Sequence, residues 1–335
     1  KVFLSQHIGD LENLEAFEFF QMTIDHIQQI FEIEPELIIH DLHPEYLSTK
    51  WAKDQSIPLL GVQHHHAHLA ACMAENNLDG PVIGIIMDGT GYGTDGTIWG
   101  GEFLLGDANG FERMAHFEPM PLPGGEAAIK SPWRIGLSYL HQVFDSNLPD
   151  SPALKDRDIQ PIIQMLDANI NSPLTSSCGR LFDAVAALSG GRQEIRYEAQ
   201  AAIEFMQVAQ NELGKDYSIF APTLTDGKYI IPIKSVLENL LSRIDTGRNV
   251  SQLSQWFHNS LIHTFVRICE ELRSEKGIEK IVLSGGVFQN RLLFEGLLAG
   301  LAQKGFSTFT HQQVPCNDGG LALGQVAIGL KYLQK

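Results

Sequence analysis

Two apolar strands that each end in glycines constrain the fold of this chain most strongly. Residues 82–87 form one apolar run, and a glycine-rich segment at residues 88–93 follows it directly. A second apolar run, residues 280–283, also ends in glycines before a helical pattern begins at Asn290. Strands that end this way are typical of α/β folds, whose ligands bind at the carboxyl ends of the strands. We therefore predict two α/β lobes that face each other across a cleft.

The hydrophobic periodicity predicts the elements of both lobes. We expect helices over residues 14–31, 46–52 and 290–303, a long helix that ends near Gly277, and strands over residues 2–5, 37–40, 57–62, 82–87, 97–99, 103–105, 280–283 and 307–310. The first lobe is predicted to comprise residues 1–118 and 315–335. The second lobe comprises residues 119–314, with an insertion at 140–176. Because the chain opens inside an expected strand, we expect it to be a segment of a longer polypeptide.

Composition excludes several classes of protein. The 335 residues, 44% hydrophobic with 31 glycines, suit an enzyme-sized α/β protein. The net charge of −16 argues against nucleic acid as a partner, because binding phosphates requires clustered Lys and Arg. No apolar run approaches the roughly 20 residues that span a bilayer, so no membrane association is expected. The four cysteines are scattered without a Cys-x-x-Cys pair, which favours a reducing cytoplasm.

His64 and His68 are the first candidate metal ligands. They follow the expected strand at 57–62 and open a segment with helical character. Two histidines one helical turn apart share a face, so both imidazoles can reach one ion. The same spacing on a helix also occurs as a purely structural feature, and by itself it does not decide between the two interpretations.

Two aspartates favour the metal interpretation. Asp88 and Asp318 both lie next to glycines at the ends of predicted elements, where carboxylates commonly face a ligand cleft. Two imidazoles and two carboxylates suit Zn²⁺ or Fe²⁺. His65 and His66 are weaker candidates, because they point to other faces of the helix. No Glu follows His64 directly, so the chain lacks the H-E-x-x-H pattern of a metalloprotease.

Glycines supply candidate phosphate-binding segments. Gly89, Thr90 and Gly91 allow close approach of a ligand to the backbone, whose N–H groups can then point at phosphate oxygens. Gly285 and Gly286 end a strand before a helix, whose N-terminus can hold an anion or a nucleotide. In each case a turn that serves packing alone remains the alternative.

Asp183 is a single carboxylate in an otherwise apolar helical segment, residues 180–187. It is either a solvated residue at the edge of the helix or an acceptor for ribose hydroxyls. No side chain stands out as a general base, and none of the four cysteines is a convincing nucleophile, so no catalytic residue is assigned.

Several segments together resemble the C-terminal part of HypF, the carbamoyltransferase family of nickel–iron hydrogenase maturation. They are residues 5–13 (SQHIGDLEN), 41–49 (DLHPEYLST), 62–68 (VQHHHAH), 99–102 (WGGE) and 283–290 (LSGGVFQN). The resemblance runs from about residue 3 to 325 and is weakest between about 205 and 250. It implies an actin/Hsp70/sugar-kinase-like (ASKHA) fold, with duplicated RNase H-like lobes around a cleft.

The resemblance also implies roles for individual residues. The family's metal-binding histidines match His64 and His68, and its metal-binding aspartates match Asp88 and Asp318. Its nucleotide-contacting residues match Asp183 and Asn290. Related proteins that make threonylcarbamoyl-adenosine in tRNA have a different residue where Asp88 stands, which favours the HypF branch.

The family chemistry sets the expected function. HypF enzymes use carbamoyl phosphate and ATP, and an upstream domain makes carbamoyl-adenylate. The domain that this chain resembles transfers the carbamoyl group to the C-terminal cysteine of HypE. The expected partners are therefore HypE, a nucleotide, a divalent ion (zinc or iron) and the upstream domains of the same polypeptide, which this sequence lacks. Two alternatives stay open: a small-molecule O-carbamoyltransferase or other ASKHA nucleotide-binding enzyme, and a nucleotide-binding scaffold with a structural metal.

Overall fold

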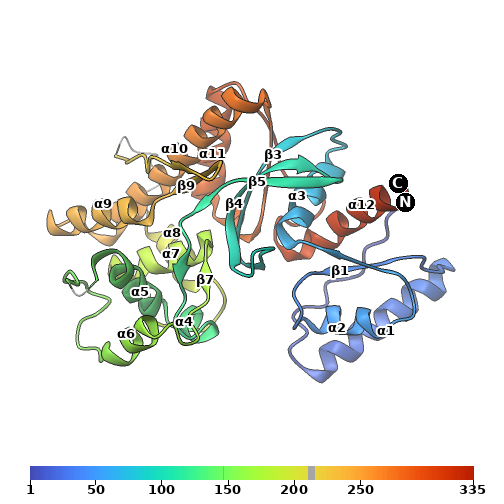
Figure 1. The fold of residues 1–335 in the computed structure, drawn as a ribbon, viewed down its shortest axis with the longest axis horizontal. Coiled ribbons are helices and arrows are strands. Elements are labelled where there is room, and N and C mark those ends of the chain that lie inside the picture. Colours follow the sequence, from blue (N-terminus) through green and yellow to red (C-terminus); the bar gives the residue numbers. More distant parts are fainter. Residues whose placement is uncertain (146, 210–215) are drawn as a thin grey trace.

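The structure, a computed structural model, describes residues 1–145, 147–209 and 216–335 (Figure 1). The helices are α1 (Leu14–Phe31), α2 (Leu47–Lys53), α3 (His64–Glu75), α4 (Glu126–Lys130), α5 (Pro132–Phe144), α6 (Gln160–Asp167), α7 (Cys178–Leu188), α8 (Gln200–Val208), α9 (Ile233–Asp245), α10 (Val250–Lys276), α11 (Arg291–Gln303) and α12 (Leu321–Leu333). The strands are β1 (Ile38–Asp41), β2 (Leu59–Val62), β3 (Val82–Tyr92), β4 (Ile98–Asp107), β5 (Gly110–Phe117), β6 (Met120–Pro121), β7 (Leu174–Thr175), β8 (Thr223–Thr225), β9 (Lys228–Ile231), β10 (Lys280–Ser284) and β11 (Ser307–Phe309). Two short 3-10 turns, η1 (Gly286–Gln289) and η2 (Asp318–Gly320), follow β10 and precede α12.

One large mixed sheet organises the molecule. Its main path runs β11-β10-β3-β4-β5-β9-β8, with β6 and β7 paired beside β4. The strands β11, β10 and β3 are parallel, whereas β3, β4 and β5 form the predicted antiparallel meander. The short strands expected at residues 97–99 and 103–105 are one continuous strand, β4.

The two faces of this sheet pack against different helices. Ile83, Ile85 and Met87 of β3 enter the large core, which also contains the buried faces of α7 and α10. The alternate residues Val82 and Ile86 enter a second cluster with the apolar side chains of α3. Successive side chains of a strand point to opposite faces, so β3 carries α3 on one side and α7 on the other.

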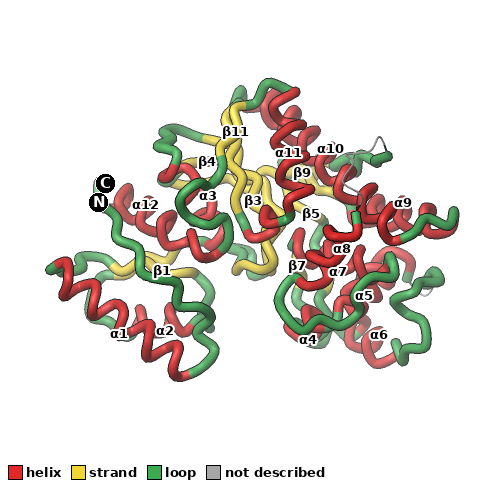
Figure 2. The backbone as a smooth tube through the Cα atoms, turned by 180° about the vertical axis from the view of Figure 1, so that it is seen from behind, coloured by secondary structure: helices red, strands yellow, loops and turns green. Residues whose placement is uncertain are grey.

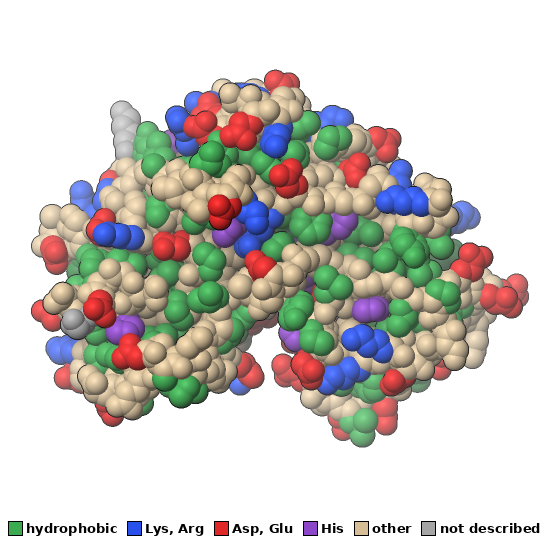
Figure 3. All heavy atoms as spheres, viewed as in Figure 1, with side chains coloured by type: hydrophobic (Ala, Val, Ile, Leu, Met, Phe, Trp, Pro, Cys, Tyr) green, Lys and Arg blue, Asp and Glu red, His purple; other side chains and the backbone are tan. Residues whose placement is uncertain are grey.

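A smaller unit lies beside the large sheet. The parallel strands β1 and β2 pair with each other, and α1 and α2 lie with them in the lower right of Figure 1. Helix α12 packs on both α3 and this strand pair, and thus joins the unit to the rest of the molecule. Seen from behind in Figure 2, α12 again lies between α3 and β1. Figure 3 shows the surface hollowed between this unit and the part that contains α4 to α6.

One predicted strand is wrong. Residues 2–5 are extended but pair with no described strand. Instead this segment lies along α1, where the ring of Phe3 stacks on Phe31 with 3.9 Å between ring centroids. The periodicity of so short a segment did not distinguish a strand that pairs in a sheet from an irregular segment that packs on a helix. The predicted helix at residues 14–31 is confirmed, since Asn13 caps it by accepting a hydrogen bond from the Ala16 amide.

The division into lobes at residues 118 and 315 stays a prediction. The segment expected to be an insertion, residues 140–176, contains the end of α5, all of α6 and β7. None of the helices in the described residues combines the length and apolar character needed to cross a membrane.

Gly324 sets how closely α12 approaches the histidine helix α3. A Cβ atom at this position would lie 1.8 Å from the carbonyl oxygen of Ala67. We expect Gly324→Ala to lower the free energy of unfolding by about 1–3 kcal/mol, measured by urea denaturation, although alanine favours helices. The control is Gly329→Ala, whose Cβ would meet the flexible end of Ile39 instead of backbone. An unchanged or raised stability of Gly324→Ala would show that the two helices adjust freely.

Candidate metal centre and adjoining cavity

The first turn of α3 places two imidazoles side by side. Strand β2 leads directly into the helix, and Gln63 caps it by accepting a hydrogen bond from the His66 amide at 2.8 Å. His64 and His68 follow one turn apart, with ring centroids 5.0 Å from each other. Both side chains are only 1% exposed. The predicted sharing of one helix face is therefore confirmed.

Two carboxylates from other elements complete the group. Asp88 in β3 places Oδ2 3.3 Å from His64 Nε2 and 3.2 Å from His68 Nε2. Asp318 in η2 places Oδ1 3.5 Å and 3.4 Å from the same two nitrogens. One ligand atom from each of the four residues lies within 4.8 Å of the other three. The structure thus brings together all four residues that the sequence analysis selected.

The charges of this group are strongly coupled. Burial disfavours a charged His64, but hydrogen bonds with Asp318, Asp41 and Asp88 raise its pKa well above the usual value. Burial likewise disfavours an ionised Asp88, but its bonds to His64 and His68 hold its pKa well below the usual value. Three carboxylates, of which Asp318 is exposed, surround two buried imidazoles, and the excess negative charge favours binding of a cation.

The donor set fits a divalent metal ion. Imidazole nitrogens and carboxylate oxygens suit Zn²⁺ or Fe²⁺, and no described thiol belongs to the group. Nε2 of His68 is buried, and none of its contacts within the described residues meets strict hydrogen-bond geometry, although Asp88 Oδ2 lies 3.2 Å away. A buried polar atom without a partner costs free energy, and a bound ion would remove that cost.

The neighbouring histidines face elsewhere, as predicted. His66 Nε2 lies 2.7 Å from the carbonyl oxygen of Asp107, and His65 Nδ1 lies 3.0 Å from the side chain of Gln63. Burial lowers the pKa of His65 to about 3, so this ring is neutral. Neither ring contributes to the four-residue group.

A cavity of about 510 Å³ opens beside the group. Its lining contains seven predicted site residues: Asp88, Gly89, Thr90, Asp183, Gly286, Asn290 and Asp318. It also contains Arg180, Glu198 and Asp10. The cavity therefore extends from the carboxylates of the candidate metal centre to the helix α7, which carries Asp183.

Two predicted glycines lie behind this surface rather than on it. Gly91 backs the histidines, since a Cβ there would lie 2.4 Å from His65 Cε1. Gly285 has a φ of +104°, and a Cβ there would lie 2.2 Å from the carbonyl oxygen of Met87. Both positions require glycine for close packing. The expected glycine-rich turn is instead part of β3, whose register shifts between Met87 and Gly91.

The amides of Gly89 and Gly286 hold Asp88. They donate to its Oδ1 at 2.8 Å and 3.2 Å, which leaves Oδ2 facing the two histidines. The Gly285 amide donates to the carbonyl of Cys316 at 2.8 Å. In this structure these three amides, which we predicted as phosphate donors, instead fix a carboxylate ligand and the loop before η2.

Asp183 is wholly buried in α7 at the wall of the cavity. Arg180 Nη2 lies 3.1 Å from the Oδ2 atom of Asp183. Within the described residues, however, no donor makes a hydrogen bond of good geometry to either carboxylate oxygen. Burial raises the pKa of Asp183 to about 6, against the lowering effect of Arg180. The interpretation as a solvated residue is therefore wrong, and an unsatisfied acceptor faces the cavity.

Asn290 also lines the cavity and caps the start of α11. Its Oδ1 accepts from the Leu293 amide at 3.2 Å, and its Nδ2 lies 2.8 Å from His258 Nε2. Because His258 Nδ1 faces the Ser254 carbonyl at 2.8 Å, that ring donates there and accepts from Asn290. The carboxamide is thus held in one orientation at the cavity surface.

Sequence reasoning missed residues that support the candidate centre. Asp41 Oδ2 lies 2.8 Å from His64 Nδ1, and Ser284 Oγ lies 3.2 Å from His68 Nδ1. Asp41 lies in one of the segments that carry the family resemblance. That resemblance was the only signal in the sequence that could have identified Asp41 as part of the site. Arg180 was noticed only as a neighbour of Asp183, although it is the one cation among the described residues that line the cavity.

The fold and site together define a Kae1-like domain of the actin/Hsp70/sugar-kinase type. Residues 84–325 match the family model described as "Carbamoyltransferase, Kae1-like Domain, second subdomain", and residues 1–75 match the HypF Kae1-like domain. The chain belongs to the HypF carbamoyltransferase family.

Individual relatives agree with this assignment. Carbamoyltransferase HypF of Rhizobium leguminosarum bv. viciae is 37% identical over 98% of this chain and 42% of its own length. A HypF homologue of Cupriavidus necator is 33% identical over 97% of this chain and 84% of its own length. A crystal structure of full-length HypF in the phosphate- and nucleotide-bound form superposes with a TM-score of 0.93, at 41% identity over 99% of this chain and 44% of that chain. The chain spans less than half the length of most of the relatives that it matches.

Proposed function

We propose that this chain carries out the transfer step of a HypF-type carbamoyltransferase. It accepts carbamoyl-adenylate, which the upstream part of a full-length enzyme forms from carbamoyl phosphate and ATP. It then transfers the carbamoyl group to the C-terminal cysteine thiol of HypE. The observation that carries this proposal is the four-residue group of His64, His68, Asp88 and Asp318, whose two carboxylates line the same cavity as Asp183.

The transfer is a substitution at the carbamoyl carbon. The cysteine sulfur forms a bond to this carbon, the bond from carbon to the phosphate oxygen breaks, and AMP leaves with the electron pair. The thiol proton is released to solvent. A divalent ion in the proposed centre would supply a Lewis acid for the carbamoyl oxygen and positive charge for the departing phosphate.

The protein side chains position the reactants. Asp183 and Asn290 both line the cavity and can receive the nucleoside. Arg180, only 4% exposed, supplies positive charge near Asp183 in a lining that is otherwise acidic. A crystal structure of full-length HypF in the phosphate- and nucleotide-bound form supports nucleotide binding in this family by analogy.

A transfer assay tests the proposal. The purified chain would be mixed with carbamoyl-adenylate, a peptide that ends in the HypE-type cysteine, and Zn²⁺ or Fe²⁺. Mass spectrometry should detect one added carbamoyl group on that cysteine. Nucleotide and metal binding without transfer would point to another acceptor, such as the hydroxyl of a small molecule. Binding of a protein partner without any turnover would point to a scaffold.

A cytoplasmic location is also proposed. All four cysteines are free, and three of them are buried, in keeping with a reducing compartment. Oxidation of the purified chain should therefore form no intramolecular disulfide, as judged by intact mass under non-reducing conditions.

Nucleotide affinity is expected to depend on pH through Asp183. An ionised carboxylate accepts hydrogen bonds from ribose hydroxyls more strongly than a protonated one, and burial raises the pKa of this residue to about 6. AMP binding, measured by calorimetry, should weaken as the pH falls through 6. Arg180 and Glu198 also act on this carboxyl group.

The matched variant is Asp183→Asn, which keeps the shape of the side chain. It should bind AMP about 10-fold more weakly at pH 8, because one charged hydrogen bond contributes about 1.5–3 kcal/mol. It should also show a weaker pH dependence near pH 6, where only the phosphate of AMP, with a second pKa of about 6, still titrates. If Asp183→Asn keeps both the affinity and the pH dependence, Asp183 does not contact the nucleotide.

A further inference from the structure

A chain of buried polar side chains leads away from His68. Its Nδ1 lies 3.2 Å from Ser284 Oγ, and Ser284 Oγ lies 2.9 Å from His311 Nε2. His311 Nδ1 in turn lies 3.0 Å from Glu75 Oε2. The chain joins α3, the end of β10 and the loop after β11. None of these three residues belongs to the four-residue group itself.

Two conditions fix the direction of these hydrogen bonds: a cation on His68 Nε2, and a neutral His311 that donates from Nδ1 to Glu75. Under these conditions His68 Nδ1 carries the proton and donates to Ser284, whose hydroxyl then donates to His311 Nε2. Ser284 Oγ also lies 3.4 Å from the carbonyl oxygen of Cys316, a longer contact than that to His311. Burial lowers the pKa of His311, against the raising effect of Glu75, which keeps the ring neutral and able to accept. Every member of the chain is satisfied in this arrangement.

Glu75 is itself held in place at the far end. It lies in the last turn of α3, two turns from His68 on the same face of the helix. Its carboxylate accepts hydrogen bonds from the amides of Gln312 and Gln313. The side chains of His311 and Glu75 are 4% and 3% exposed. The loop after β11 is thereby tied to the histidine helix.

The two histidines of the centre are supported in parallel ways. Nδ1 of His64 meets the carboxylate of Asp41 directly, at 2.8 Å. Nδ1 of His68 reaches the carboxylate of Glu75 through Ser284 and His311. Carboxylates behind ligating histidines fix the tautomer and ring orientation and raise the basicity of the ligand. The orientation that Asp41 gives to His64 directly would thus be given to His68 by Glu75 through Ser284 and His311.

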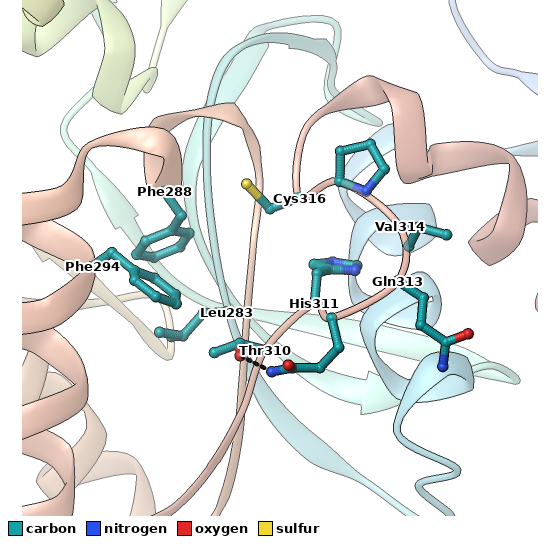
Figure 4. A pocket seen from close by; sticks show the side chains of 10 residues that line it. Leu283, Phe288, Phe294, Thr310, His311, Gln313, Val314 and Cys316 are labelled. Atoms are coloured by element: carbon teal, nitrogen blue, oxygen red, sulfur yellow. Dashed lines mark hydrogen bonds between the residues drawn. The ribbon is translucent and has the colours of Figure 1, made fainter. Parts of the chain in front are cut away.

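The same three residues also have the order of a Ser–His–carboxylate nucleophile. Ser284 is wholly buried and lines neither of the two adjoining cavities, whereas His311 lines the smaller one, of about 360 Å³. Figure 4 shows the ring of His311 among the lining side chains of that cavity. A substrate carbonyl cannot reach a hydroxyl that has no exposed surface, so a nucleophilic role does not fit.

We propose that Ser284, His311 and Glu75 form a positioning relay that holds His68 in the tautomer and orientation required to bind a divalent cation. The proposal rests on the metal centre of the proposed function. It assigns no catalytic role to these residues, since none touches the reactants.

The test is the affinity of the whole chain for Zn²⁺, measured by competition with a chelator. Ser284→Ala removes the hydroxyl from the middle of the relay and should weaken binding by about 10- to 100-fold. Ser138→Ala is the matched control, because it removes another fully buried hydroxyl, which donates to the Pro121 carbonyl at 2.6 Å in a distant part of the fold. The control should bind Zn²⁺ like the wild type. The melting temperature without metal shows whether each variant is folded.

A double-mutant cycle separates a relay from three independent packing residues. Glu75→Gln keeps the shape of the side chain and one carbonyl oxygen but removes the charge, and should weaken Zn²⁺ binding by about 10-fold. In the Ser284→Ala background it should cause no further loss, because the connection to His68 is already broken. If Ser284→Ala does not fold, the Zn²⁺ affinity of Glu75→Gln alone tests the relay: a loss supports it, and wild-type affinity contradicts it.

Three outcomes would overturn the relay. Wild-type affinity in Ser284→Ala would show that His68 needs no such support. Fully additive effects of the two substitutions would show that Glu75 does not act through Ser284. Failure of the wild type to bind Zn²⁺ would remove the metal centre itself, and with it the relay, whereas the first two outcomes leave the proposed centre intact.

Discussion

Replacing His68 with alanine is expected to lower the rate of carbamoyl transfer at least about 100-fold, while the chain stays folded. The side chain contributes one of two imidazoles to a group in which four ligand atoms lie within 4.8 Å of one another. Its loss leaves one imidazole and two carboxylates, so a bound ion would lose one of its four protein ligands and be held more weakly. The measurement is the transfer assay with mass spectrometry, together with Zn²⁺ binding by chelator competition.

The matched control is His66→Ala, two residues earlier in the same helix. His66 is also buried, but its Nε2 faces the carbonyl oxygen of Asp107 instead of the metal centre. This variant should keep both Zn²⁺ binding and transfer. AMP binding should survive in both variants, because neither histidine lines the cavity that we propose for the nucleotide. Undiminished transfer by a folded His68→Ala chain would exclude the proposed metal-assisted mechanism.

Replacing Arg113 with methionine is expected to lower the free energy of unfolding by about 3–5 kcal/mol. The side chain of Glu102 is 0% exposed, and Arg113 Nε lies 2.6 Å from its Oε2. The Arg113 guanidinium also lies 3.9 Å from the centre of the Trp99 ring. Methionine keeps much of this packing but leaves the carboxylate buried without its partner. Urea denaturation at neutral pH measures the loss.

The pH dependence of this variant should have the opposite sign to that of the wild type. Burial disfavours an ionised Glu102, but Arg113 keeps its pKa below the usual 4.5, so the pair stabilises the wild type above that pH and the contribution is lost on acidification. Without Arg113, burial raises the pKa of Glu102 in the folded state. The stability of the variant should then fall as the pH rises, and the two proteins should converge below about pH 4.5.

Two further variants serve as controls for the buried pair. Adding Glu102→Gln to Arg113→Met removes the unpaired charge and should recover part of the loss, while the amide oxygen still accepts from the Gly100 and Gly101 amides. Lys130→Ala breaks an exposed pair with Glu126 and should leave the midpoint unchanged. A loss from Arg113→Met no larger than that from Lys130→Ala would show that Glu102 is neutral in the folded chain.

This ion pair also explains a segment to which sequence reasoning gave no role. The family resemblance includes the segment Trp99-Gly100-Gly101-Glu102, but the sequence pattern offered no structural reason for these residues. In the structure, the two glycine amides, Ser176 and Arg113 all donate to the Glu102 carboxylate. Trp99 covers the guanidinium. The partners come from β4, β5 and the segment before α7, and no local pattern in the sequence connects them.

The sequence by itself determined the features that depend on local spacing. Helix α1 begins and ends where its periodicity predicts, and the i,i+4 spacing places His64 and His68 on one face. The positions of Asp88 and Asp318 next to glycines at the ends of predicted elements selected both residues, and the family resemblance implied the same role. These features can be predicted from the sequence because helix periodicity involves residues only a few positions apart.

Only the tertiary structure decided which groups support the site and in what chemical state. It showed that Gly89 and Gly286 hold Asp88, that Asp183 is buried and not solvated, and that Ser284 lies against His68 from 216 positions away. Sheet register and helix packing create these contacts, and burial shifts the pKa values. Both depend on the whole chain folding around one core, so no local sequence pattern contains them.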